Sequence, residues 1–162
     1  MQWLRFAFLL CLVSVLQAGL LEHFDVRPDL LLILLVFFAI YCDTSEAIVT
    51  SFTIGFAADI IVISSAMGPR IISFGLFGTL LAYLHRVIAI RKMPYQAAAI
   101  FLTGLLAGAL AHFLAALKGE PTPPNMFTVL FVSCLCSAIV GPFLFLPSAW
   151  WMRIKTQRFS RY

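Results

Sequence analysis

Residues 30–38 read LLLILLVFF, an unbroken run of large apolar side chains. A membrane-barrel strand would instead alternate apolar and polar residues, so this run predicts a helix. Of the 162 residues, 62% are hydrophobic and only 11% are charged, whereas a soluble domain carries about 25% charged residues. These proportions exclude an ordinary soluble domain and a disordered chain, and they indicate a small polytopic membrane protein.

Six apolar stretches predict an all-α membrane protein with six transmembrane helices. We expect one polytopic membrane domain over residues 1–162, with a basic tail at 152–162. Its helices are expected approximately at 4–21, 27–42, 47–65, 69–86, 95–117 and 126–151. A crossing needs about 20 residues, so the second and fourth helices are short, and a re-entrant second segment with five crossings is the alternative. Gly141-Pro142 and Pro147 predict a kink or break in the last helix.

The distribution of Lys and Arg predicts the orientation. With six crossings and the N-terminus inside, the inner segments hold eight basic residues, namely Arg5, Arg86, Arg91, Lys92, Arg153, Lys155, Arg158 and Arg161. The outer turns hold three, namely Arg27, Arg70 and Lys118. This bias predicts that both termini are cytoplasmic, although the inner turn from Asp43 to Glu46 has no basic residue. The tail lacks an accompanying folded domain, so we expect no nucleic-acid partner.

Asp59 is the most informative polar residue, because it lies well inside the third apolar stretch. A carboxylate at that depth costs a few kcal/mol on insertion scales and normally faces a protein partner. It could serve an ion pathway or recognition site, or it could be satisfied by another helix. Judged by depth, Asp59, His112, Arg27 and Asp29 could form one polar cluster beneath the outer surface.

Two further motifs have mainly structural interpretations. In Arg27-Pro28-Asp29 we expect Pro in the first turn of the second helix and Asp29 at its positive end. Gly104 and Gly108 are four residues apart, which lets helices approach closely, either within this chain or against a partner.

The sequence offers little for metal binding or catalysis. Glu22, His23 and Asp25 include a single His, which is too few ligands for a metal site. An intramembrane enzyme could use Asp59 and His112, but no nucleophile is evident. We therefore expect no metal, no cofactor and no enzymatic activity.

The order of these motifs resembles the MreD family of bacterial rod shape-determining membrane proteins. The resemblance rests on Arg27-Pro28-Asp29, the apolar run, a short polar turn, Gly55-Phe56-Ala57-Ala58-Asp59-Ile60, and a Gly-containing fourth helix with basic residues after it. It is clearest over residues 20–92. The family-matching positions are Arg27, Pro28, Asp29, Gly55 and Asp59, and the match does not assign their individual roles.

The resemblance implies a non-enzymatic scaffold in the bacterial inner membrane. MreD-like proteins partner MreC, a single-span protein, and they work beside MreB, RodA and a penicillin-binding protein in the elongasome, which builds side-wall peptidoglycan. Their fold is similar to the substrate-binding subunits of energy-coupling-factor transporters. The alternative function is therefore a vitamin-binding transporter subunit, for which the outer polar groups of this chain are sparse.

Overall fold

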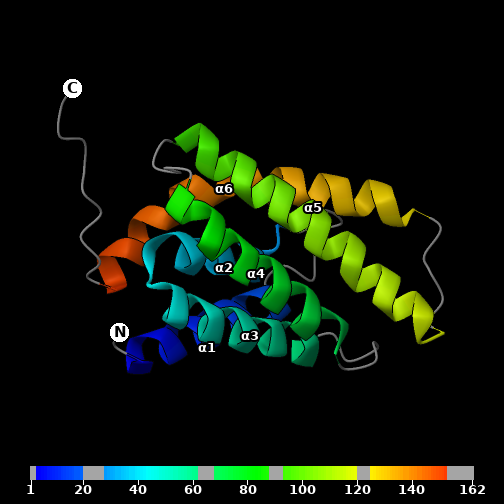
Figure 1. Cartoon of the computed structure of the whole chain (residues 1–162), viewed down its shortest axis with the longest axis horizontal. Coiled ribbons are helices and arrows are strands. Elements are labelled where there is room, and N and C mark those ends of the chain that lie inside the picture. Colours follow the sequence, from blue (N-terminus) through cyan, green and yellow to red (C-terminus); the bar gives the residue numbers. More distant parts are fainter. Residues whose placement is uncertain (1–2, 20–27, 62–67, 88–92, 120–124, 153–162) are drawn as a thin grey trace.

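The computed structural model of the protein describes residues 3–19, 28–61, 68–87, 93–119 and 125–152. All regular secondary structure in these ranges is helical, which confirms the all-α prediction. The six helices, shown in Figure 1, are α1 (Trp3–Gly19), α2 (Leu30–Tyr41), α3 (Thr44–Ile61), α4 (Pro69–Val87), α5 (Met93–Leu117) and α6 (Met126–Met152).

The apolar helix α2 lies at the centre of the molecule. It packs against each of the other five helices, and these form a ring in the order α1, α3, α4, α5, α6 and back to α1. All ten residues from Leu31 to Ile40 are buried. A helix enclosed on every side has no face that must be polar, so the unbroken run of apolar residues follows from this central position.

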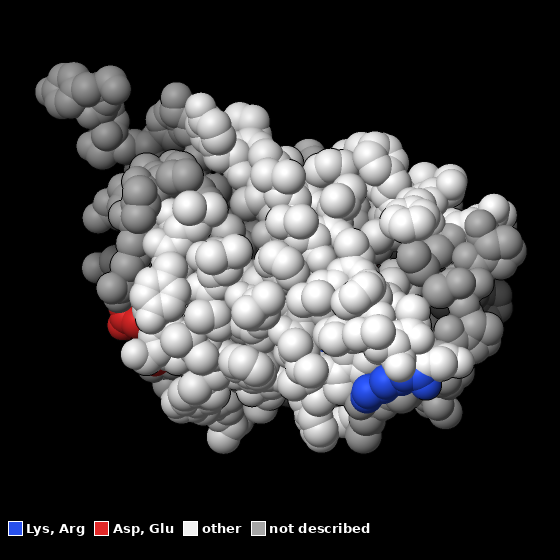
Figure 2. Space-filling model, turned by 45° about the vertical axis from the view of Figure 1, so that its right-hand side comes forward, with Lys and Arg blue, Asp and Glu red and all other residues white. Residues whose placement is uncertain are grey.

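The helices of the ring are apolar on their outward faces. Three spans in the described ranges are long and apolar enough to cross a membrane: Thr44–Ile61, Pro94–Leu117 and Phe127–Phe145. Only 22–39% of the residues in these spans are buried inside the protein. On the face drawn in Figure 2, charged atoms of the described residues appear only towards the two ends. Such an uncharged, apolar exterior is suited to lipid and would be a large exposed patch in water.

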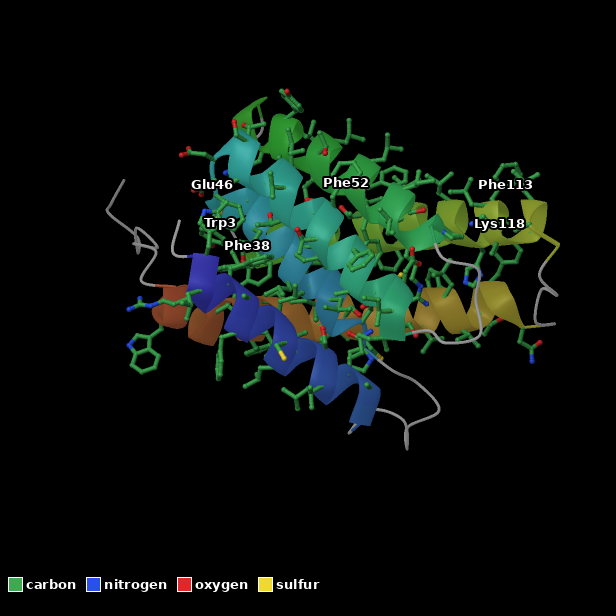
Figure 3. All side chains as sticks on the ribbon, turned by 90° about the horizontal axis from the view of Figure 1, so that it is seen from below. Trp3, Phe38, Glu46, Phe52, Phe113 and Lys118 are labelled. Atoms are coloured by element: carbon green, nitrogen blue, oxygen red, sulfur yellow. The ribbon has the colours of Figure 1, made fainter. Side chains whose placement is uncertain are left out.

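The two ends of the helix bundle differ in the residues that they carry. Helix α1 begins at the same end at which α6 finishes (Figure 1). Trp3 and Glu46 lie at this end, whereas Lys118 lies at the opposite one (Figure 3). A tryptophan in the first turn of a membrane helix is typical of the membrane–water interface.

The differences from the sequence-based expectation that affect the packing concern three helices. Helix α2 starts at Leu30 rather than at 27, because Asp29 is its N-cap and Pro28 precedes that cap, outside the first helical turn. Helix α3 starts at Thr44, three residues earlier than expected. Helix α6 continues through Gly141 and Pro142 to Met152, so a break there was a wrong prediction, whereas the kink stays a prediction.

The continuity of α6 has a packing reason. A Cβ added at Gly141 would collide with the Ile100 side chain of α5 and lie 3.6 Å from Ile33 Cγ1 of α2. Gly141 therefore lets α6 lie close to two other helices instead of ending it. A membrane helix tolerates an internal Pro when neighbouring helices pack against it.

Candidate functional site

Asp59 binds the first turn of α4. Its side chain is only 3% exposed, near the end of α3. Oδ2 accepts hydrogen bonds from the N–H groups of Gly68, at 2.8 Å, and Ile71, at 3.2 Å, and Oδ1 accepts one from Arg70, at 3.2 Å. The buried carboxylate is therefore satisfied by the backbone of the next helix, which also places negative charge at the positive end of its dipole.

These three bonds account for every free N–H at the start of α4. A helix leaves its first N–H groups without intrahelical partners. Here Pro69 has no N–H, and the N–H of Ile72 makes the first helical bond, to the carbonyl oxygen of Gly68. The remaining donors are Gly68, Arg70 and Ile71, the three that Asp59 binds. One carboxylate thus supplies the acceptors for a helix start that is only partly exposed.

Gly55 makes this capping geometry possible. It lies one helical turn before Asp59, on the same face of α3. A Cβ added at Gly55 would lie 2.9 Å from the Cα of Ile71 and 3.0 Å from the carbonyl oxygen of Arg70. Only glycine allows the backbone of α4 to come so close, so Gly55 and Asp59 act together as one packing and capping motif.

A second network holds the start of α2. Asp29 Oδ1 accepts bonds from Leu32 N–H, at 3.2 Å, and from Gln17 Nε2 of α1, at 3.1 Å. The Oε1 of Gln17 in turn accepts the N–H of Leu31 at 3.0 Å. The N–H of Asp29 donates to Ser137 Oγ of α6 at 2.8 Å, so three helices meet at this helix start.

The structure replaces the expected polar cluster by these two networks. Asp59 joins α3 to α4, whereas Asp29 joins α1, α2 and α6. Within the described ranges, no hydrogen bond connects Asp59 with Asp29, or His112 with either of them. Arg27 lies outside the described residues. The expectation rested on depth along the bundle, which carries no information on which side of the central helix each carboxylate faces.

Gln17 and Ser137 were missed by the sequence analysis. Each is a polar residue within an apolar helix, in α1 and α6 respectively. Polar side chains in membrane helices commonly bond to neighbouring helices. That signal was available in the sequence, although it could not identify Asp29 as the shared partner.

Gly104 and Gly108 pack inside the chain. A Cβ at Gly104 would lie 2.5 Å from Leu32 Cδ2 of α2 and 3.0 Å from Cys134 Sγ of α6. One at Gly108 would collide with the Leu130 side chain of α6. Of the two interpretations of this glycine pair, these contacts favour packing within the chain over a partner-facing surface.

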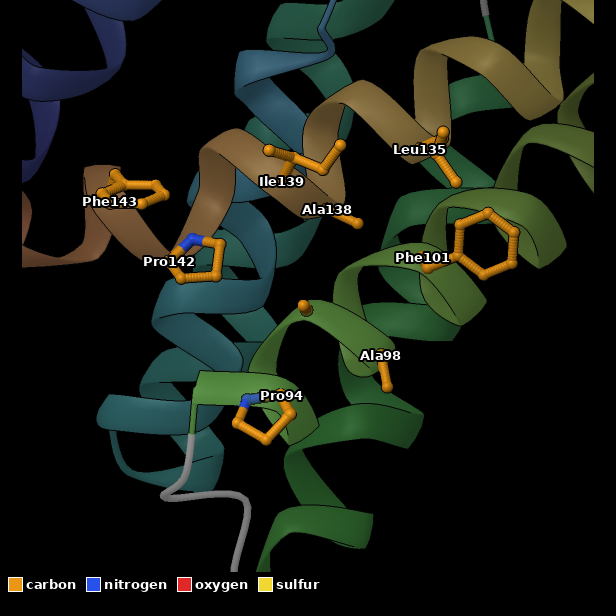
Figure 4. Close-up of a pocket in the computed structure, with 9 residues that line it drawn as sticks. Pro94, Ala98, Phe101, Leu135, Ala138, Ile139, Pro142 and Phe143 are labelled. Atoms are coloured by element: carbon orange, nitrogen blue, oxygen red, sulfur yellow. The ribbon is translucent and has the colours of Figure 1, made fainter.

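An apolar groove of about 510 Å³ runs between α5 and α6 on the outside of the ring. Small side chains, Ala97, Ala98 and Ala138, contribute to its lining, together with larger groups such as Phe101 and Phe143. Figure 4 shows these side chains reaching the groove from both helices. The groove is therefore a face on which another apolar helix could lie closely.

The described residues contain no group of three His, Cys, Asp or Glu side chains that could hold a metal ion. Glu22, His23 and Asp25 lie outside these residues. Both carboxylate oxygens of Asp59, and Oδ1 of Asp29, accept hydrogen bonds from the protein. These carboxylates therefore hold neighbouring helices together through hydrogen bonds.

Comparison with known families identifies the chain. The sequence model of the family described as rod shape-determining protein MreD matches residues 1–150. This chain belongs to the MreD family. The match includes both capping networks and the α5–α6 groove. A search of curated proteins and one of solved structures each found no match, so the similarity of the MreD fold to energy-coupling-factor subunits stays a prediction for this chain.

Membership of the MreD family gives the general role of the chain. Its members determine rod shape, and they are structural proteins that are not known as enzymes. The family and the three apolar spans together indicate an inner-membrane protein associated with the rod-shape machinery.

Proposed function

We propose that this MreD-family chain is a non-enzymatic scaffold of the cell-elongation machinery that binds the membrane helix of an MreC-like protein. The observation that carries this proposal is the family match over residues 1–150. The capping networks support it, because their polar groups are engaged in holding helices together. A rigid bundle with an apolar exterior is suited to presenting a fixed face to another helix.

The groove between α5 and α6 is the face that we propose for the partner helix. Its lining combines alanines, which permit close backbone approach, with aromatic groups at the sides. Without a hydrophobic driving force inside lipid, helix association depends on such close packing. Binding there would place the MreC-like protein, and through it RodA, a penicillin-binding protein and MreB, beside the bundle to support side-wall peptidoglycan synthesis.

We further propose six crossings with both termini in the cytoplasm. The start of α1 and the finish of α6 at one end of the bundle support an even number of crossings. The eight-to-three bias of basic residues supports the orientation. Labelling single introduced cysteines beside Glu46 and Lys118 with a membrane-impermeant reagent in intact cells tests this, with labelling expected only near Lys118.

The main test is co-purification from membranes of an MreC-like protein with three versions of this chain. Ala98→Trp fills the groove and is expected to abolish co-purification. Leu80→Trp changes an exposed residue of α4 and is expected to leave it intact. Retention of the partner by both variants would reject the groove, and failure of the unsubstituted chain to bind would reject the scaffold. Tight binding of a vitamin in that case would favour the transporter-subunit alternative.

A further inference from the structure

A second groove lies between α1 and α6 and has a volume of about 310 Å³. Its walls are the segment Phe8 to Leu16 of α1, Leu30 to Phe37 of α2, and Leu144 to Trp150 of α6. Of all neighbouring pairs in the ring, α1 and α6 touch the least. The groove is thus a gap in the ring that reaches inward to the central helix.

The lining of this groove excludes water as its occupant. Its volume would hold about ten water molecules at about 30 Å³ each. The polar groups in the lining are the indole N–H of Trp150 and the hydroxyl of Ser148, which already donates to the carbonyl oxygen of Leu144 at 2.9 Å. Buried waters need two to four polar partners each, so this groove requires an apolar occupant.

The length and lining of the groove suit an acyl chain. The α1 wall from Phe8 to Leu16 rises about 12 Å, and apolar side chains of three helices line the groove. A single hydrocarbon chain is thin and flexible enough to follow such a space.

Charge and aromatic groups at one end of the groove indicate the kind of lipid. Arg5 precedes Phe8, Leu9 and Leu12 by three, four and seven residues, so it shares their face of α1 at the mouth of the groove. Trp3 and Trp150 are exposed on α1 and α6 respectively, near the start of one and the finish of the other. Tryptophan is enriched at the headgroup level, where the guanidinium of Arg5 would meet a phosphate.

We propose that this groove binds one acyl chain of an anionic phospholipid whose phosphate is held by Arg5. The sequence beyond α6 adds four basic residues within 153–162, which increases the attraction of this end for anionic headgroups. The proposal is independent of the scaffold function, because the groove lies on the opposite side of α6 from α5. A lipid bound in this groove would close the gap between α1 and α6.

Native mass spectrometry of the full chain in detergent tests the headgroup. Phosphatidylglycerol and phosphatidylcholine with identical acyl chains serve as probes. The unsubstituted chain is expected to prefer phosphatidylglycerol, Arg5→Gln to reduce that preference about fivefold, and Arg5→Lys to retain it. Arg70→Gln, at the start of α4, is the charge-matched control and is expected to have no effect. Equal binding of both lipids, or equal effects of Arg5→Gln and Arg70→Gln, would overturn the proposal.

A pair of substitutions on one helix tests the groove. Leu12→Trp enlarges a residue of the lining, whereas Val15→Trp enlarges an exposed residue of α1 outside it. Leu12→Trp is expected to reduce retention of both lipids severalfold, and Val15→Trp to match the unsubstituted chain. Equal retention by the two variants contradicts an acyl chain in this groove. A preference lost only when the four tail residues are neutralised assigns the headgroup to the tail and also overturns the role of Arg5.

Discussion

The starts of α2 and α4 solve the same physical problem in different ways. Each presents free N–H groups in a part-buried position beside other helices, and each is capped by an aspartate. The cap of α2 is Asp29, the residue directly before the helix. The cap of α4 is Asp59, which lies nine residues before Gly68 and belongs to another helix. A local cap defines where a helix begins, whereas a remote cap also fixes which helix lies beside it.

The two caps also differ in how their hydrogen bonds are shared. At α2, the donors are divided between Asp29 and Gln17, and Ser137 accepts a further bond. At α4, a single carboxylate accepts all three bonds. We therefore expect the start of α4 to be more sensitive to a single substitution than the start of α2.

The largest effect is expected for Asp59→Ala. It removes the acceptor of three part-buried N–H groups, at about 1 kcal/mol for each hydrogen bond, so the free energy of unfolding should fall by about 3 kcal/mol. Unfolding by SDS in mixed micelles measures this. Ile60→Ala, at an exposed position of α3 directly after Asp59, is the control, expected within about 0.5 kcal/mol of the unsubstituted chain. Equal losses for the two variants would refute the remote cap.

Gly55→Ala should come next, with a loss of about 1–3 kcal/mol from overpacking. The added methyl group meets the backbone of α4, which cannot rotate away as a side chain can. Gly19→Ala is the matched helical control, because no atom lies within 4 Å of its added Cβ. The same SDS titration compares the two, and a Gly55→Ala variant as stable as Gly19→Ala would show that the close approach is unnecessary.

Asp29→Ala is expected to cost about 1–2 kcal/mol, the usual range for loss of an N-cap. Because Gln17 bonds both to Asp29 and to the N–H of Leu31, the double variant with Gln17→Ala should lose less than the sum of the two single losses, by about 0.5 kcal/mol or more. A double-mutant cycle on unfolding free energies measures this coupling. Strict additivity would mean that the two residues act separately.

Ser137→Ala should have the smallest effect, about 1 kcal/mol, because it removes one acceptor from the N–H of Asp29. Ser148→Ala is the control, since that hydroxyl bonds only to its own helix. Amide exchange at Asp29 provides a direct measurement and should quicken in Ser137→Ala alone. Unchanged amide exchange would show that α6 does not contribute to the cap of α2.

Much of the bundle could be predicted from local patterns. The apolar run at 30–38 predicted a membrane helix, and the aspartate after Pro28 placed charge at its start. The exact position of Pro28 was missed, because its role depends on whether the helix begins before or after Asp29. Of the two outcomes expected in α6, a kink or a break, the break was wrong, because Gly141 lets neighbouring helices pack against α6 and support it.

The partner of Asp59 shows the limit of such reasoning most clearly. Its depth indicated that it must be satisfied, and the sequence suggested His112, Arg27 or Asp29 as partners. The structure instead uses backbone N–H groups, which every residue except Pro carries and which no sequence pattern distinguishes. The choice depends on Gly55, since only the absence of a Cβ brings those donors within reach.

By itself, the sequence determined that this chain forms apolar helices suited to a membrane, because continuous hydrophobic runs leave few other stable structures in lipid. The tertiary structure alone decided that α2 is the central helix and that Asp29 and Asp59 face different neighbours. Packing decides these positions because an apolar helix can lie against either lipid or protein. Close contacts and the need to satisfy buried hydrogen-bonding groups then select one arrangement.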